Sequence, residues 1–183
     1  MSIESELQKL LTACGVKHFT ARELLIHTDR PLNHEPTTAQ LHNILPAAIV
    51  LDTARAVLHA PIRLTSVFRS PAYNESIGGV ERSQHMDFVA IDFTTGPFRN
   101  AYDLLLKWRK ADLMYKSEAP FWPMVTTDRE WEDLPTWDAR DYDLDSSWSP
   151  SQLFLWRGGL AFYPKQNFIH LDARGIDRTW RGR

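Results

Sequence analysis

The sequence lacks several features that would point to well-defined classes of protein. It contains one cysteine, Cys14, in 183 residues, which excludes an internal disulfide and a structural zinc site built from four thiolates. Its formal net charge is −2, which gives no basis for predicting binding to nucleic acid or to an anionic membrane. No uninterrupted apolar run approaches the roughly 20 residues of a membrane-spanning helix, so we expect no membrane insertion.

A targeting signal is also missing from the beginning of the sequence. Residues 1–6 have no basic start and no long apolar segment, so we expect synthesis in the cytoplasm without a signal peptide. The content of 43% hydrophobic and 24% charged residues is ordinary for a globular protein. The length suits one hydrophobic core, and we expect a single domain over residues 1–183.

Hydrophobic periodicity predicts a mixture of helices and short strands. Pro46 falls within the longest helical stretch and should kink or restart it. A further helix or turn should begin at Ser70. The predicted helices cover residues 2–14, 20–26, 37–59 and 98–110, and the predicted strands cover residues 62–67, 88–93 and 168–171.

Residues 111–150 differ in composition from the rest of the chain. They hold ten acidic residues, three basic residues and four tryptophans. Disordered segments are poor in aromatic residues, so we expect an ordered but irregular insertion. Two roles stay open: the tryptophans pack a small satellite core, or they form one wall of a cleft and stack on sugar rings. A sugar-binding protein built on this insertion is a corresponding alternative function.

The most informative residues are histidines and aspartates in two short runs. Residues 83–92 contain His85 and Asp92, and residues 168–175 contain His170 and Asp172. Side chains two apart on a strand point to the same face, so His170 and Asp172 should lie together. His85 should lie on the turn that enters the first strand.

Two histidines and a carboxylate form the donor set of a catalytic zinc, which keeps its fourth position open. A metal here would therefore serve chemistry. A histidine in an apolar run is, however, more often a hydrogen-bonded structural residue than a ligand. The spacing alone leaves both interpretations open.

Four short motifs in sequence order extend this pattern. Together they resemble the zinc D-Ala-D-Ala carboxypeptidase family, which shares its fold with the hedgehog signalling domain and phage peptidoglycan endopeptidases. Residues 18–24 also resemble the start of the phage-type branch. The resemblance implies an α+β fold in which a small antiparallel sheet carries a zinc site and helices pack against it. The motifs are FRSPAYN with GG (68–74, 78–79), SQH (83–85), AID (90–92), and GGLAFYP with FIHLDARG (158–164, 168–175).

The resemblance assigns roles to individual residues. It implies that Zn²⁺ is held by His85, Asp92 and His170. It implies that Arg69 holds a substrate carboxylate or polarises the scissile carbonyl, tasks that suit a forked guanidinium. Ser83 would bind substrate or orient His85. Without the motif, Arg69 would be interpreted as a surface ion pair and Ser83 as a turn cap.

Two departures from the family pattern bear on activity. Several members carry glycine three residues after the first histidine, where this chain has Phe88; its ring either narrows the pocket or fills the core. Many members carry an acidic general base three residues before the last histidine, where this chain has Asn167, which takes up no proton at neutral pH. Asp172 is the candidate replacement, either as the catalytic base or as a partner that orients a ligand histidine.

These observations predict a zinc metallopeptidase that cleaves the peptide stem of peptidoglycan. Without a signal peptide, the expected setting is phage or bacterial cell-wall lysis, by an endolysin or by an enzyme carried on a phage particle. The bond could be D-Ala-D-Ala, D-Ala-diaminopimelate or L-Ala-D-Glu. The alternative is a non-catalytic zinc-binding structural or cell-wall-binding module on the same fold, such as a phage tail component, and Asn167 is its main support.

Overall fold

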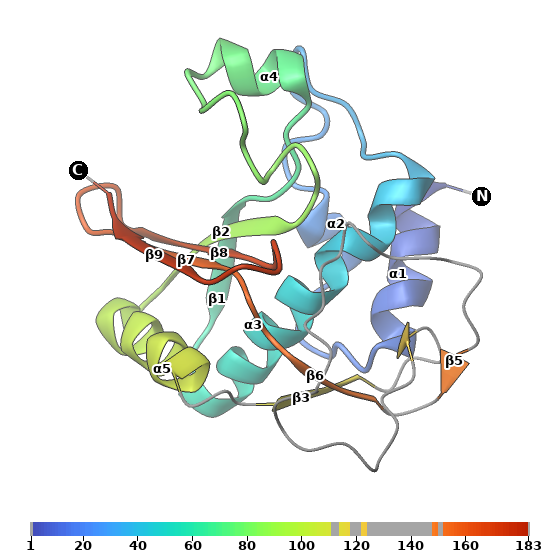
Figure 1. Cartoon of the computed structure of the whole chain (residues 1–183). Helices are drawn as coiled ribbons and strands as arrows, with labels where there is room; N and C mark the ends of the chain where they lie inside the picture. The colour runs from blue at the N-terminus through green and yellow to red at the C-terminus, as the bar shows by residue number, and fades with distance from the viewer. Residues whose placement is uncertain (1, 111–113, 118–121, 124–147, 150–151, 183) are drawn as a thin grey trace.

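A computed structural model describes residues 2–110, 114–117, 122–123, 148–149 and 152–182 of the chain. A five-stranded sheet has helices α3 and α5 on one side and α4 on the other (Figure 1). The helices are α1 (Ile3–Ala13), α2 (Ala21–Leu24), the 3-10 helix η1 (Thr38–Ile44), α3 (Leu45–Leu58), α4 (Pro71–Ser76) and α5 (Phe98–Lys110). The strands of this sheet are β1 (Ile62–Ser66), β2 (Ala90–Thr95), β7 (Gly159–Tyr163), β8 (Phe168–Asp172) and β9 (Arg178–Arg181).

The strands lie in the order β1-β2-β8-β7-β9. This architecture confirms the predicted α+β class, but the expectation of a purely antiparallel sheet is wrong at one edge. β9 pairs in parallel with β7. The reason lies in the connection after β8, which returns the chain to the start of β7, where the Arg178 N–H donates to the Gly158 carbonyl at 3.1 Å. The sheet is therefore mixed.

Local signals set the helix boundaries. The Ser2 hydroxyl accepts the Ser5 N–H at the start of α1, and Thr20 and Glu23 form a reciprocal capping box at α2. The stretch predicted as one helix over 37–59 divides into η1 and α3. Pro46 lies in the first turn of α3, where its missing N–H costs nothing, so the predicted restart at Pro46 is confirmed.

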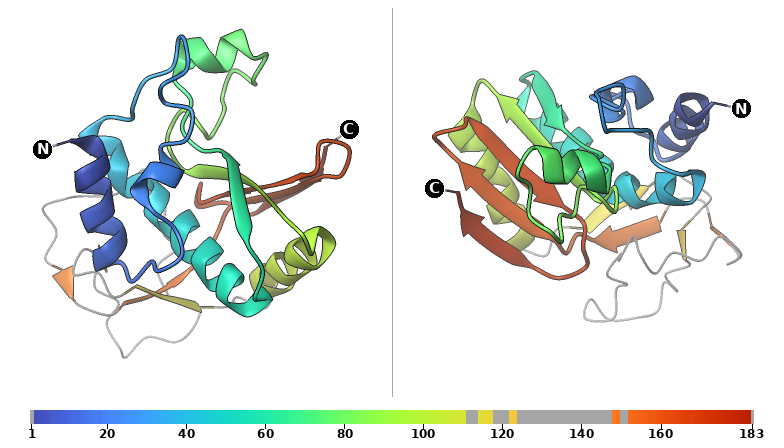
Figure 2. Two further views of the ribbon diagram at one scale, coloured as in Figure 1. Left: turned by 180° about the vertical axis from the view of Figure 1, so that it is seen from behind. Right: turned by 90° about the horizontal axis from the view of Figure 1, so that it is seen from above.

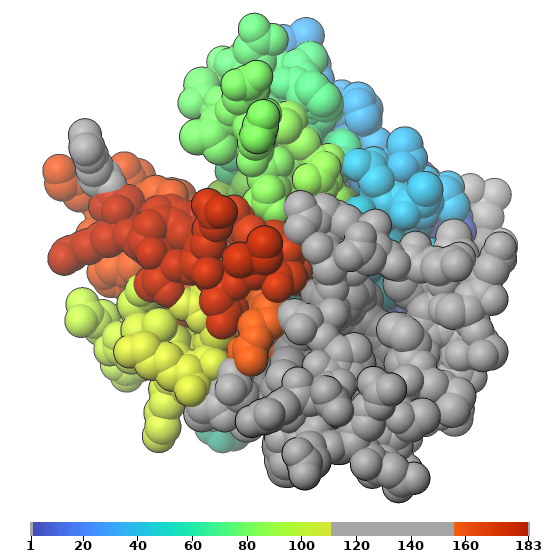
Figure 3. All heavy atoms as spheres, viewed as in Figure 1, coloured from blue at the N-terminus to red at the C-terminus, as the bar shows by residue number. Residues whose placement is uncertain are grey.

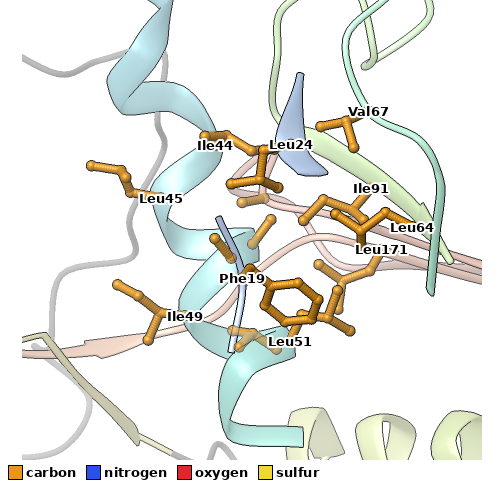
Figure 4. Packing of buried hydrophobic residues seen from close by; sticks show 14 of the residues in the cluster. Phe19, Leu24, Ile44, Leu45, Ile49, Leu51, Leu64, Val67, Ile91 and Leu171 are labelled. Carbon is orange, nitrogen blue, oxygen red and sulfur yellow. The ribbon is translucent and has the colours of Figure 1, made fainter. Parts of the chain in front are cut away.

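The segment Thr38–Leu58 is long and apolar enough to cross a membrane by length and composition, and 67% of its most apolar window is buried inside the fold. Its apolar side chains contribute to a continuous core. In Figure 4, Ile44 and Leu51 of this segment lie on the side of the helix that holds the other labelled core residues, whereas Leu45 and Ile49 point to its opposite side; the other labelled residues are Phe19, Leu24, Leu64, Val67, Ile91 and Leu171. The apolarity of the segment is thus accounted for by packing between α1, α2 and the sheet.

The strand predicted to begin at Phe88 begins at Ala90 instead. Phe88 has a left-handed backbone, with φ of 56°, and its N–H donates to the His85 carbonyl. Its ring is fully buried and meets Phe68 edge to face at 5.7 Å between centroids. Of the two predicted roles for this ring, Phe88 therefore fills the core. A left-handed position is also where glycine fits without strain.

Most of the predicted insertion at 111–150 lies outside the described residues. Within it and directly after it, the backbone forms two short antiparallel pairs. β3 (Met114–Ser117) pairs with β6 (Gln152–Leu155), and β4 (Trp122–Pro123) pairs with β5 (Trp148–Ser149). The proposed roles of its tryptophans stay predictions.

Candidate metal centre

The centre lies on the face of the sheet opposite α3 and α5, on one row of residues that crosses four strands. Asp92 of β2 is paired with His170 of β8, His170 with Ala161 of β7, and Ala161 with Trp180 of β9. Since side chains on neighbouring strands at the same register share a face, this row presents a carboxylate, an imidazole and an indole side by side. The methyl group of Ala161 leaves space between the two rings, whose centroids lie 5.3 Å apart.

His85 joins this row from the turn before β2. Its Nδ1 lies 2.6 Å from the Val67 carbonyl oxygen, an acceptor, so Nδ1 carries the ring proton. Nε2 is then the nitrogen with a free lone pair, and it lies 3.2 Å from Asp92 Oδ2. The hydrogen bond from Nδ1 to the Val67 carbonyl fixes the tautomer and the ring orientation that a metal-binding histidine needs.

The three predicted ligands converge. His85, Asp92 and His170 each offer one ligand atom, and these atoms lie within 4.8 Å of one another. His170 Nδ1 is 2.8 Å from Asp92 Oδ1, and all three side chains are buried. Two imidazole nitrogens and one carboxylate oxygen around one point fit a divalent zinc ion with a fourth position left for water.

The ionisation of the three groups reflects their mutual contact. Burial lowers the pKa of His85. Burial alone would also lower the pKa of His170, but its hydrogen bonds to Asp172 and Asp92 raise that pKa to about 9. Burial would raise the pKa of Asp92, yet His85 and His170 hold it well below its usual range. In the metal-free protein the site is thus an imidazolium held between two carboxylates.

Asp172 is fully buried beneath His170. Its Oδ2 lies 2.9 Å from His170 Nε2, and its Oδ1 accepts the Gly159 N–H at 2.8 Å. A Cβ at position 159 would come within 2.3 Å of Oδ2, so glycine is required there. The Arg174 guanidinium donates to both carboxylate oxygens.

Burial alone would raise the pKa of Asp172, but Arg174 and His170 hold it well below its usual range. A carboxylate with these partners is a weak base. Of its two predicted roles, this geometry favours the one in which Asp172 orients His170.

The other predicted site residues also lie at the centre. The Arg69 guanidinium donates to Asp92 Oδ2 at 2.7 Å and to Ser66 Oγ at 2.8 Å. Ser83 is buried, and both Arg69 and Ser83 line the cavity next to His85. Their roles toward substrate stay predictions.

Asn167 lies away from the centre. It is exposed in the turn between β7 and β8, with a left-handed φ of 56°, a conformation that asparagine tolerates better than most residues. Backbone geometry thus explains the asparagine.

The centre opens into a cavity of about 460 Å³. The surface is hollowed between the α4 segment (residues 70–84, green) and strands β7–β9 (red), as Figure 3 shows. The buried Asn74 shapes the first wall, since its side-chain amide N–H donates to the Val80 carbonyl at 2.9 Å and its backbone carbonyl accepts the Gly79 N–H. Sequence reasoning missed several lining residues, and the basic stretch after position 173 was an available signal for two of them, Arg174 and Arg178. The missed residues are Arg82, Tyr163, Phe168, Arg174, Arg178 and Trp180.

An α+β fold with a buried His–Asp–His centre at the base of a cavity is the arrangement of a metallopeptidase. The Peptidase M15 family model matches residues 17–114, more than half of the chain, and the chain belongs to this family of metallopeptidases. The match includes Arg69, His85 and Asp92, while His170 lies beyond it and reaches the centre through the pairing of β8 with β2. The comparisons with curated proteins and with solved structures gave no match.

Proposed function

We propose that this metallopeptidase uses zinc and cleaves the peptide stem of peptidoglycan, in the lysis of a cell wall by a phage or a bacterium. The observation that carries the proposal is the convergence of His85, Asp92 and His170 within 4.8 Å at a cavity that Arg69 also lines. The family supplies the class of reaction. The cell-wall substrate and the release of the protein on lysis, or its carriage on a phage particle, follow from the motif resemblance.

When bound, zinc would act as a Lewis acid toward a peptide carbonyl and lower the pKa of water to about 7. The residues of this chain would hold and aim the reacting groups. His85 and His170 are locked in orientation by the Val67 carbonyl and by Asp172. Arg69 lies next to Asp92 and can fork onto two oxygens of a substrate carboxylate or carbonyl.

The alternative function is a non-catalytic zinc-binding or cell-wall-binding module on the same fold. Asn167 at the usual position of the base and the fully hydrogen-bonded Asp172 favour it. Among the described residues that line the cavity, Asp92 is the one carboxylate, and zinc binding would engage it. A catalytic base would then come from Asp172 after rearrangement or from residues 111–150.

The two functions can be separated with purified peptidoglycan. Zinc-loaded protein would be assayed by zymogram, and released peptides would be identified by mass spectrometry beside a chelator-treated sample. A peptidase clears the gel and releases fragments that name the bond, and the chelated sample does neither. Zinc-loaded protein that sediments with peptidoglycan but releases nothing would establish the binding module.

A further inference from the structure

The cavity at the metal centre has an unusual concentration of positive charge. Four arginines line it, whereas Asp92 is the one acidic residue among the described lining residues. The chain as a whole carries a formal net charge of −2, so the basic character belongs to this cavity. A divalent metal would add to it.

Two of the four arginines are already paired. Arg69 forms an ion pair with Asp92, and Arg174 forms one with Asp172 beneath the centre. Both pairs are largely buried, with 16% and 18% of the arginine side chains exposed. These two arginines therefore balance the carboxylates of the centre itself.

The other two arginines have no such partner. Arg82 and Arg178 are exposed, and neither forms an ion pair or a side-chain hydrogen bond within the part of the chain that the structure describes. They come from opposite walls: Arg82 follows the Gly78-Gly79 loop, and Arg178 is the first residue of β9. Two exposed arginines that line one cavity do not stabilise each other, since like charges repel.

We propose that Arg82 and Arg178 bind a second carboxylate of the substrate, on a side chain of the peptide that occupies the cavity. The ligand class is an acidic peptide, because the substrate of a peptidase is a peptide and a guanidinium forms strong, charge-assisted hydrogen bonds with a carboxylate. In stem peptides this favours diaminopimelate over lysine at the third position, since the two residues differ by one carboxylate. The inference rests on the proposed function and adds the substrate class to it.

The test uses binding, which does not depend on turnover. Two synthetic pentapeptide stems, identical except for diaminopimelate or lysine at the third position, would be titrated into the full chain by calorimetry, with and without zinc. We expect the wild type to bind the diaminopimelate peptide about tenfold more tightly, the scale of one charge-assisted hydrogen bond. Arg82→Gln and Arg178→Gln should each remove most of that preference.

Arg22→Gln is the matched control, because Arg22 is exposed on α2 and does not line the cavity. The Arg22→Gln variant should keep the preference for the diaminopimelate peptide. Unchanged melting temperatures would show that the cavity variants fold, as expected for exposed side chains. Equal affinity of the wild type for the two peptides, or equal loss of both affinities in the cavity variants, would overturn the inference.

Failure of the proposed function has a different signature. If the charge preference is present but no peptide is cut with zinc bound, the inference stands and the catalytic proposal fails. If peptides are cut and the charge preference does not depend on the residue at position 82 or 178, the catalytic proposal stands and the inference fails. Raising the salt concentration should weaken the preference of the wild type more than that of either variant.

Discussion

The two faces of the central sheet use the same strands for opposite purposes. On one face, Ile91 and Phe93 of β2 and Ile169 and Leu171 of β8 pack in the apolar core. Phe162 of β7 stacks on Phe98 of α5, with ring centroids 4.9 Å apart. On the other face, the alternate residues of the same strands are Asp92, His170 and Asp172, which are as deeply buried.

The difference shows what allows a charged face to be buried. Burial of an unpaired charge costs several kcal/mol, so the acidic and imidazole groups of the site face must satisfy one another. Asp92 contacts His85, His170 and Arg69, and Asp172 contacts His170 and Arg174. The core face depends on packing alone. Changes to the site face should therefore affect metal binding and pH response, whereas changes to the core face should affect stability.

The largest effect is expected from His85→Ala. This variant removes one of three ligands and leaves a pair, so zinc content should fall from about one ion per chain to nearly none. Inductively coupled plasma mass spectrometry of the purified protein measures it. The matched control is His59→Asn, which changes an exposed histidine in a left-handed position that asparagine also accepts. Full zinc content in His85→Ala would contradict the ligand assignment.

On the core side, Phe88→Ala should destabilise the fold by about 3–5 kcal/mol, the usual loss for a buried phenylalanine. Phe88→Gly should lose about 1 kcal/mol less, because glycine adopts a φ of 56° without strain. Denaturant unfolding measures both. Val57→Ala, at a half-exposed position on α3, should stay within about 0.5 kcal/mol of wild type.

Zinc content of the two Phe88 variants should stay unchanged, since Phe88 does not line the cavity. Loss of zinc in a variant that still folds would show that this ring supports the centre directly. An alanine variant more stable than the glycine variant would contradict the role assigned to the left-handed backbone.

Several features of the molecule could be predicted from local sequence or from motifs. Ser2, Thr20 and Pro46 act on neighbouring residues, so caps and the helix restart could be predicted from local sequence. His85, Asp92 and His170 could be predicted because their motifs carry chemistry.

Features that depend on contacts between distant segments could not be predicted in this way. The parallel pairing of β9 with β7 includes a backbone hydrogen bond from Arg178 to Gly158, two residues that are far apart in the sequence. The same pairing brings Arg178 and Trp180 to the cavity, so their place at the site was missed. The strand was predicted to begin at Phe88, two residues too early, because periodicity does not detect a left-handed residue.

Asp172→Asn should have a smaller effect than removal of a ligand. If Asp172 orients His170, the variant should lose about 10- to 100-fold in zinc affinity, measured by competition with a chelating dye. If Asp172 is the base, zinc affinity should stay and turnover should fall roughly a hundredfold or more. The contacts favour the first result. Asp103→Asn, an exposed carboxylate on α5, should change neither quantity.

The site face should also respond to pH in the zinc-free protein. The folded pKa of His170 is raised to about 9 from an ordinary 6.5. Its contribution to stability is therefore complete below pH 6.5 and is lost as pH rises through about 9. Urea unfolding at pH 6 and pH 9.5 should show this loss in chelator-treated protein. Zinc-loaded protein should lose less, since the metal replaces the proton, and equal losses would contradict the prediction.

The smallest effect is expected from the helical side of the molecule, with the opposite sign. Burial lowers the pKa of His42 in η1, partly offset by Glu6. The folded state then binds fewer protons than the unfolded state, so the contribution of His42 is complete above pH 6.5 and is lost as pH falls below it. Unfolding free energies at pH 7 and pH 5 should fall less in His42→Gln than in wild type, and His59→Asn should behave as wild type. An equal fall in His42→Gln and wild type would show that His42 does not contribute to acid sensitivity.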